Sequence, residues 1–185
     1  MDFSIAKKWW SELAPRLGEI LPVYATVVFF LYTWMLMHFF WKVPSWLYFL
    51  SVGEVLNLLA YSLFVNLIES IVFTLFIVGI CLFIPTKLLH GKFVACGGIL
   101  GFILLLWIAA FDLMSAWIVL SKVQILAWLL CVILSVSLFM FFVIRFPSLR
   151  KIVTNICDRF VVFLYLLIPL SLLGGGVILV QLLFG

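Results

Sequence analysis

Two glutamates, Glu54 and Glu69, interrupt long apolar stretches and carry the clearest chemical potential in this sequence. On one continuous helix, Ser51, Glu54, Ser62 and Glu69 fall within an arc of about 80°, with Asn57 in the same segment. Because ionisable groups at membrane depth are costly, this stripe predicts a path for protons or small cations. The alternative is that the stripe faces other helices or a partner subunit, whose polar side chains satisfy it.

Histidine is the second residue type that suggests chemistry, and the chain has two, His38 in MLMHFFW and His90 in TKLLHGKF. Neutral imidazole ligates haem iron and other tetrapyrrole metals, so His38 is a candidate cofactor ligand. No second histidine has the spacing of a bis-histidine haem site, and the cofactor is left open. His90 lies with Lys87 and Lys92 in a basic turn that we expect to face lipid headgroups.

Motifs for catalysis and for metal binding are missing from the sequence. It contains no GxSxG, GxxxxGK[ST] or HExxH. The cysteines show no CxxC spacing, and we expect buried thiols rather than disulfides or a metal site. We therefore expect no catalytic residues and no enzymatic activity. The cysteines are Cys81, Cys96, Cys131 and Cys157.

The composition indicates which solvent must surround these residues. The chain has 185 residues, of which 68% are hydrophobic and 10% charged, against about 45–50% and about 25% in soluble domains. A soluble chain of this size could not enclose so much apolar surface, whereas a lipid bilayer removes the problem. The formal charge of +4 does not indicate nucleic-acid binding, because the basic residues lie in short gaps between apolar runs.

A membrane-crossing helix needs about 20 mostly apolar residues, and five runs qualify. They are residues 22–41, 62–84, 93–111, 123–144 and 160–184. We therefore predict an all-α, polytopic transmembrane helical bundle, with residues 21–185 as one domain. Asp112 ends the third run, where we expect it to be solvated or paired with Lys122.

The basic residues orient these spans, because cytoplasmic loops carry the excess of Lys and Arg. Five spans leave only Lys42 and Lys122 on one side, so we predict the N-terminus inside and the C-terminus outside. Glu69 would then lie about two turns below the outer boundary of the second span. The opposite side holds Lys7, Lys8, Arg16, Lys87, Lys92, Arg145, Arg150, Lys151 and Arg159.

Two segments are expected at the membrane surface rather than across it. Residues 1–20 contain Lys7, Lys8, Trp9 and Trp10, which are typical of a cytoplasmic interfacial amphipathic segment on lipid headgroups. Residues 44–61 are apolar enough to compete as a sixth span, but a sixth span would weaken the charge bias. We interpret them as an outer interfacial helix or an extension of the second span.

Small residues predict close helix packing in the third and fifth spans. Gly97 and Gly101 form a GxxxG pair, which lets helices approach closely in lipid. Pro169 precedes a run of three glycines and would weaken the fifth span at mid-membrane, as at the binding sites of many transporters or at a simple kink. The run is Gly174, Gly175 and Gly176.

Three functions remain open at this level. The first is a non-catalytic integral membrane subunit, scaffold or anchor of a larger complex, favoured by minimal loops and 20 Phe residues that offer wide lateral contacts. Its partners would be lipid and other membrane subunits or copies of itself, with a bacterial plasma (inner) membrane as the expected location. The second is a small proton or cation transporter or channel that uses the Glu54 and Glu69 stripe.

The third rests on a resemblance of architecture. Five spans with the N-terminus inside and the C-terminus outside resemble the membrane domains of extracellular alkaline-phosphatase-like transferases, such as lipoteichoic acid synthases. The resemblance covers topology and no motif residue. It implies a membrane domain that serves an extracellular catalytic domain.

Overall fold

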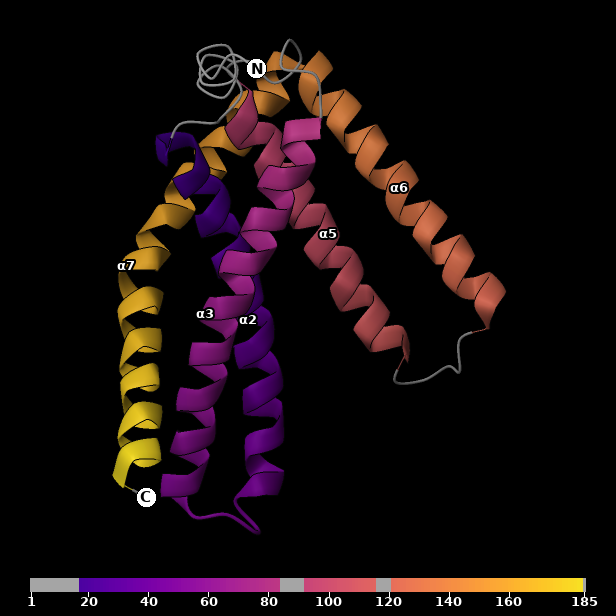
Figure 1. Ribbon diagram of the computed structural model, residues 1–185. Helices are drawn as coiled ribbons and strands as arrows, with labels where there is room; N and C mark the ends of the chain where they lie inside the picture. Colours follow the sequence, from indigo (N-terminus) through magenta and orange to yellow (C-terminus); the bar gives the residue numbers. More distant parts are fainter. Residues whose placement is uncertain (1–16, 84–91, 116–120, 185) are drawn as a thin grey trace, which may run out of the picture.

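The computed structural model describes residues 17–83, 92–115 and 121–184, which form five long helices (Figure 1). All five are long and apolar enough to cross a membrane. The predicted all-helical class with five membrane-length helices is therefore confirmed. The helices are α2 (Leu17–Trp46), α3 (Val52–Phe83), α5 (Phe93–Ser115), α6 (Lys122–Arg145) and α7 (Pro147–Phe184).

The helices extend beyond the apolar runs that predicted them. α3 begins at Val52, so residues 52–61 are its first turns, while residues 44–46 end α2. α7 likewise begins at Pro147 rather than near residue 160. A charge marks the end of an apolar run, but a helix continues through it until its backbone groups find a cap. The predicted interfacial segment with Lys7, Lys8, Trp9 and Trp10 lies outside the described residues.

Capping residues define where three of the helices begin. Ser51 and Glu54 exchange hydrogen bonds at the start of α3: the Ser51 N–H donates to Glu54 Oε2 at 2.7 Å, and the Glu54 N–H donates to Ser51 Oγ at 3.4 Å. Ser121 and Gln124 form the same capping box before α6. α7 opens with Pro147, whose missing N–H costs nothing at a first helical position.

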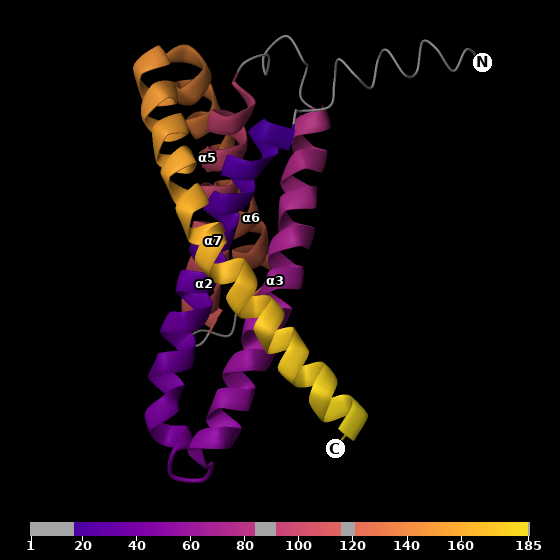
Figure 2. The ribbon, with the colours of Figure 1, turned by 90° about the vertical axis from the view of Figure 1, so that its left-hand side faces the viewer.

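Successive helices run in alternating directions, as Figure 1 shows. α2, α3 and α7 pack side by side, and α7 crosses the other two obliquely in the view of Figure 2. The beginning of α5 packs on α2, and the α5–α6 pair then splays away from the other helices. α6 touches mainly α5 and α7, so it is the helix with the least buried surface.

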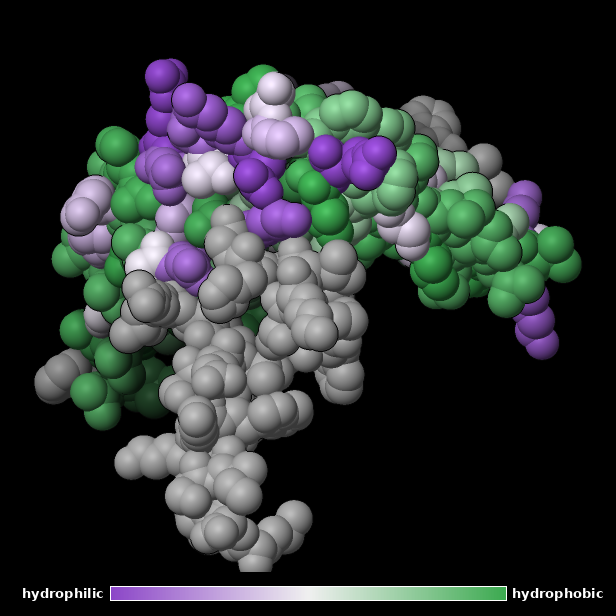
Figure 3. Space-filling view, turned by 90° about the horizontal axis from the view of Figure 1, so that it is seen from above, coloured by the Kyte–Doolittle hydropathy of each residue, from purple (hydrophilic) through white to green (hydrophobic). Residues whose placement is uncertain are grey.

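Charged residues mark the two ends of the molecule. We call the end that carries Lys92, Arg145, Arg150 and Lys151 the basic end. Figure 3, which looks onto this end, shows hydrophilic residues gathered there and hydrophobic residues along the splayed α5–α6 side. The α2–α3 turn and the end of α7 lie at the opposite end. Most charged side chains of the described residues thus lie near the two ends, whereas Glu69 and Asp112 lie between them.

Glycines allow the closest helix contacts. A Cβ on Gly97 would lie 3.0 Å from Val23 Cγ2, and one on Gly101 would lie 2.9 Å from Ile77 Cδ1, so α5 approaches α2 and α3 there. On α7, a Cβ on Gly174 would lie 2.6 Å from the Ala60 carbonyl oxygen, and one on Gly175 would lie 2.6 Å from the Phe64 ring.

Gly176 and Pro169 complete the segment of α7 predicted to be weak; Gly176 makes no such close contact, and Pro169 does not interrupt the helix. A Cβ on Gly176 would meet nothing within 4 Å, so this glycine is not needed for a close contact among the described residues. α7 stays helical through Pro169 and the glycines. A groove of about 900 Å³ along this part of α7 is lined mainly by apolar residues, including Pro169, Gly176 and Val177.

Candidate functional site

The predicted stripe of polar residues is divided into two separate places along α3. Glu54 lies in the first turn, where Ser51 Oγ also donates to its Oε2 at 2.8 Å, so this carboxylate serves the helix cap. Glu69 lies 15 residues further on, about 22 Å away along the helix axis. Helix geometry therefore does not bring the two carboxylates together.

Glu54 and Asn57 line a pocket of about 360 Å³ between the start of α3 and the end of α7. Tyr61 and Gln181 add two further polar side chains, and the rest of the lining is aliphatic. The pocket lies at the end opposite the basic end. Gln181 was not identified from the sequence, because its position beside α3 depends on how α7 crosses that helix.

Glu69 lies at the middle of α3. The uncharged stretches 55–68 and 70–83 flank it symmetrically within the helix. The side chain is exposed, and no hydrogen bond or ion pair joins it to another of the described residues. The exposed Val72 and Phe76 lie on the same side of α3, so an ionisable group stands in an apolar surface.

Asn66 lies one turn from Glu69, near the edge of the buried side of α3. It is only 4% exposed, and its Nδ2 has no hydrogen-bond acceptor among the described residues. A buried amide nitrogen without an acceptor is uncommon, because the group loses its hydration on burial. The Glu69 carboxylate and the Asn66 amide nitrogen, which both lack a hydrogen-bond partner among the described residues, therefore lie one turn apart near the middle of α3.

A network of buried hydroxyls connects α2, α3 and α7 near these residues. Tyr32 Oη lies 2.6 Å from Ser171 Oγ and donates to the Leu63 carbonyl oxygen at 3.3 Å. Ser70 Oγ donates to the Leu67 carbonyl oxygen at 2.7 Å and lies 3.4 Å from Tyr24 Oη. These groups are largely satisfied within the chain, so they hold helices together.

The hydroxyl network was not predicted, although part of its pattern is visible in the sequence. Asn66, Ser70 and Thr74 recur every four residues, which places them on one face of α3. All three are buried. The contact of Ser70 with Tyr24 on α2 joins positions distant in the sequence, so the spacing alone could not identify it.

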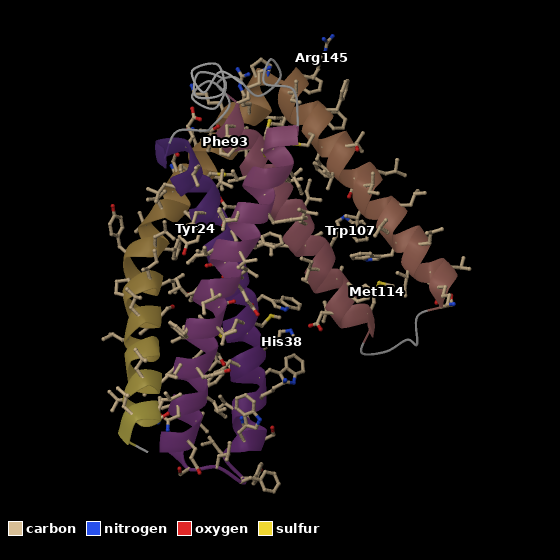
Figure 4. The ribbon with its side chains drawn as sticks, in the orientation of Figure 1. Tyr24, His38, Phe93, Trp107, Met114 and Arg145 are labelled. Atoms are coloured by element: carbon tan, nitrogen blue, oxygen red, sulfur yellow. The ribbon has the colours of Figure 1, made fainter. Side chains whose placement is uncertain are left out.

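His38 faces a carboxylate that the sequence did not pair with it. His38 Nε2 lies 3.8 Å from Asp112 Oδ2, and the Trp34 ring packs 4.6 Å from the imidazole centroid. Figure 4 shows His38 on the side of α2 that faces α5. Asp112 on α5 therefore lies beside His38 on α2. From the sequence we expected Asp112 to be solvated or paired with Lys122.

The potential metal-ligating side chains are spread over the residues that the structure covers. They include no group of three or more His, Cys, Asp or Glu side chains placed to hold a metal ion. Cys81, Cys96 and Cys157 are buried free thiols, as expected. Cys131 is free but exposed, because α6 packs sparsely.

Aromatic side chains fasten α6 to α5. Trp107 Nε1 donates to Ser135 Oγ at 2.8 Å, and Trp128 packs against the rings of Trp107 and Phe111. Figure 4 labels Trp107 on the inner side of the splayed pair.

No family model, curated protein or solved structure matches this chain.

Proposed function

We propose that this chain is a non-catalytic integral membrane subunit, a scaffold or anchor of a larger membrane protein complex. The observation that carries the proposal is Glu69, an exposed carboxylate in the middle of a membrane-length helix. On one insertion scale an Asp, Lys or Arg at the centre of a spanning helix costs about 2.5–3.5 kcal/mol. A partner subunit that covers Glu69 removes this cost, whereas lipid tails do not.

The proposed arrangement places the helices as a five-span bundle in a bacterial plasma (inner) membrane. The basic end, with Arg145 and Arg150, faces the cytoplasm, because retained loops there are rich in basic residues. The N-terminus is then inside and the C-terminus outside. Glu69 lies in the hydrocarbon core in this arrangement, since uncharged helix extends for about 20 Å on either side.

The size and composition of the native particle test this proposal. The full chain is extracted from its own membrane in mild detergent, its particle mass is measured by light scattering, and its companions are identified by mass spectrometry. We expect a second membrane protein at fixed stoichiometry. A stable, monodisperse monomer without a companion would contradict the proposal.

A second candidate is passage of protons or small cations past Glu69. The specific observation is the pairing of this exposed carboxylate with the buried Asn66 amide one turn away, since both groups would be solvated by water in a polar path. The candidate predicts proton or cation flux in liposomes that Glu69→Gln abolishes while the melting temperature is kept. Absence of flux in the wild-type protein would exclude it.

A further inference from the structure

We propose that Glu69 receives a basic side chain, Lys or Arg, from a transmembrane helix of the partner subunit. This inference rests on the proposed function and adds the chemistry of the partner. The partner helix would lie on the stripe of α3 formed by Val65, Glu69, Val72 and Phe76, which we call the Glu69 face. These positions follow the i, i+4, i+7, i+11 spacing of one side of a helix.

The exposure of the Glu69 face leaves room for a partner. Val72 is 60% and Phe76 56% exposed, and Glu69 between them is exposed as well. α2, α7 and α5 pack on the other sides of α3, through residues such as Leu63 in the buried core, Ala60 at the α7 contact and Ile77 at the α5 contact. A helix can therefore approach the Glu69 face without displacing any of them.

The charge of Glu69 selects the class of partner. A carboxylate only accepts hydrogen bonds when it is ionised, and in a low-dielectric medium its attraction to a cation is much stronger than in water. An ammonium or guanidinium group supplies both the charge and the donors.

A second copy of this chain fits the Glu69 face poorly. Every basic residue among those that the structure describes borders an uncharged run instead of lying inside one; they are Lys42, Lys92, Lys122, Arg145, Arg150, Lys151 and Arg159. A symmetric copy would present Glu69 to Glu69, and like charges at close range repel. The observations therefore favour a different membrane protein.

Photo-cross-linking in the native membrane tests this inference. A photoreactive amino acid replaces Val72 on the Glu69 face or, as a control, Leu130 on exposed α6, and the adducts are identified by mass spectrometry. We expect the Val72 adduct to contain a transmembrane segment with a Lys or Arg inside its apolar run. Glu69→Gln should lower the yield of that adduct about tenfold, which corresponds to about 1.4 kcal/mol.

Matched variants separate charge from folding. Glu19→Gln removes the same charge from the first turn of α2 and should leave the Val72 adduct unchanged. Glu69→Lys should abolish the adduct, and exchange of the partner's basic residue for Glu should restore it. A melting measurement on each variant shows that the chain still folds.

The remaining outcomes are distinguishable. An adduct with a segment that lacks a basic residue, an adduct with a second copy of this chain, or an unchanged yield in Glu69→Gln would overturn the cationic contact and leave the complex in place. Adducts with lipid alone at position 72 would overturn both the contact and the proposed function.

Discussion

At the scale of single residues, Tyr32 shows how polar side chains stabilise this apolar molecule. Its ring is 1% exposed, and its hydroxyl bridges Ser171 on α7 and the Leu63 carbonyl oxygen on α3. In lipid, helix association receives no hydrophobic driving force, so packing and hydrogen bonds of this kind must supply it. Tyr32 thus joins three helices at one atom.

We expect Tyr32→Phe to destabilise the protein by about 0.6 kcal/mol and by at most about 1.7 kcal/mol, the mean and the maximum measured for hydrogen bonds between membrane helices. Thermal or denaturant unfolding in detergent measures the change. Tyr165→Phe is the matched control, because Tyr165 lies on α7 but is 79% exposed. Equal losses of stability in the two variants would show that the bridge through Tyr32 does not hold the helices together.

At the scale of the elements, the α3–α7 contact depends on glycine rather than on side-chain fit. A Cβ on Gly174 would lie 2.6 Å from a backbone oxygen of α3, which cannot move aside as the end of a side chain can. Two residues later, Gly176 meets nothing. Neighbouring glycines of one helix therefore have different roles.

Gly174→Ala should destabilise the protein by about 1–3 kcal/mol through overpacking, because α7 must move away from α3. Gly176→Ala should be neutral or slightly stabilising, since alanine favours a helix by about 1 kcal/mol over glycine. The two midpoints of unfolding are compared in one detergent. A loss in Gly176→Ala as large as that in Gly174→Ala would contradict this account.

The sequence predicted the five long helices because each apolar run must satisfy its own backbone hydrogen bonds in lipid. It left open whether residues 44–61 form an interfacial helix or extend the second span. The structure has residues 52–61 as the first turns of α3, where Glu54 caps the helix it belongs to. With this start, Glu69 lies at the middle of α3. The contacts of Tyr32 and His38 join different helices, and no local spacing encodes such pairs.

At the scale of the whole molecule, polarity is concentrated at the two ends. Arg145 and Arg150 lie at the basic end, while Lys42 and Glu54 lie at the other end, beside the α2–α3 turn. Glu69 departs from this division, because uncharged stretches flank it on both sides within α3. Asp112 also lies away from the ends, beside His38, which is eight residues before the end of α2. The proposal of a partner subunit therefore depends on the two ends lying in different compartments with α3 crossing between them.

Cysteine accessibility in intact cells measures most directly on which side of the membrane each end of the molecule lies. A membrane-impermeant maleimide is applied to Ser45→Cys, at the end of α2, and to Arg150→Cys, at the basic end. The proposed arrangement predicts that Ser45→Cys reacts in intact cells and that Arg150→Cys reacts only after the membrane is opened. Reaction of both positions from the same side would contradict it.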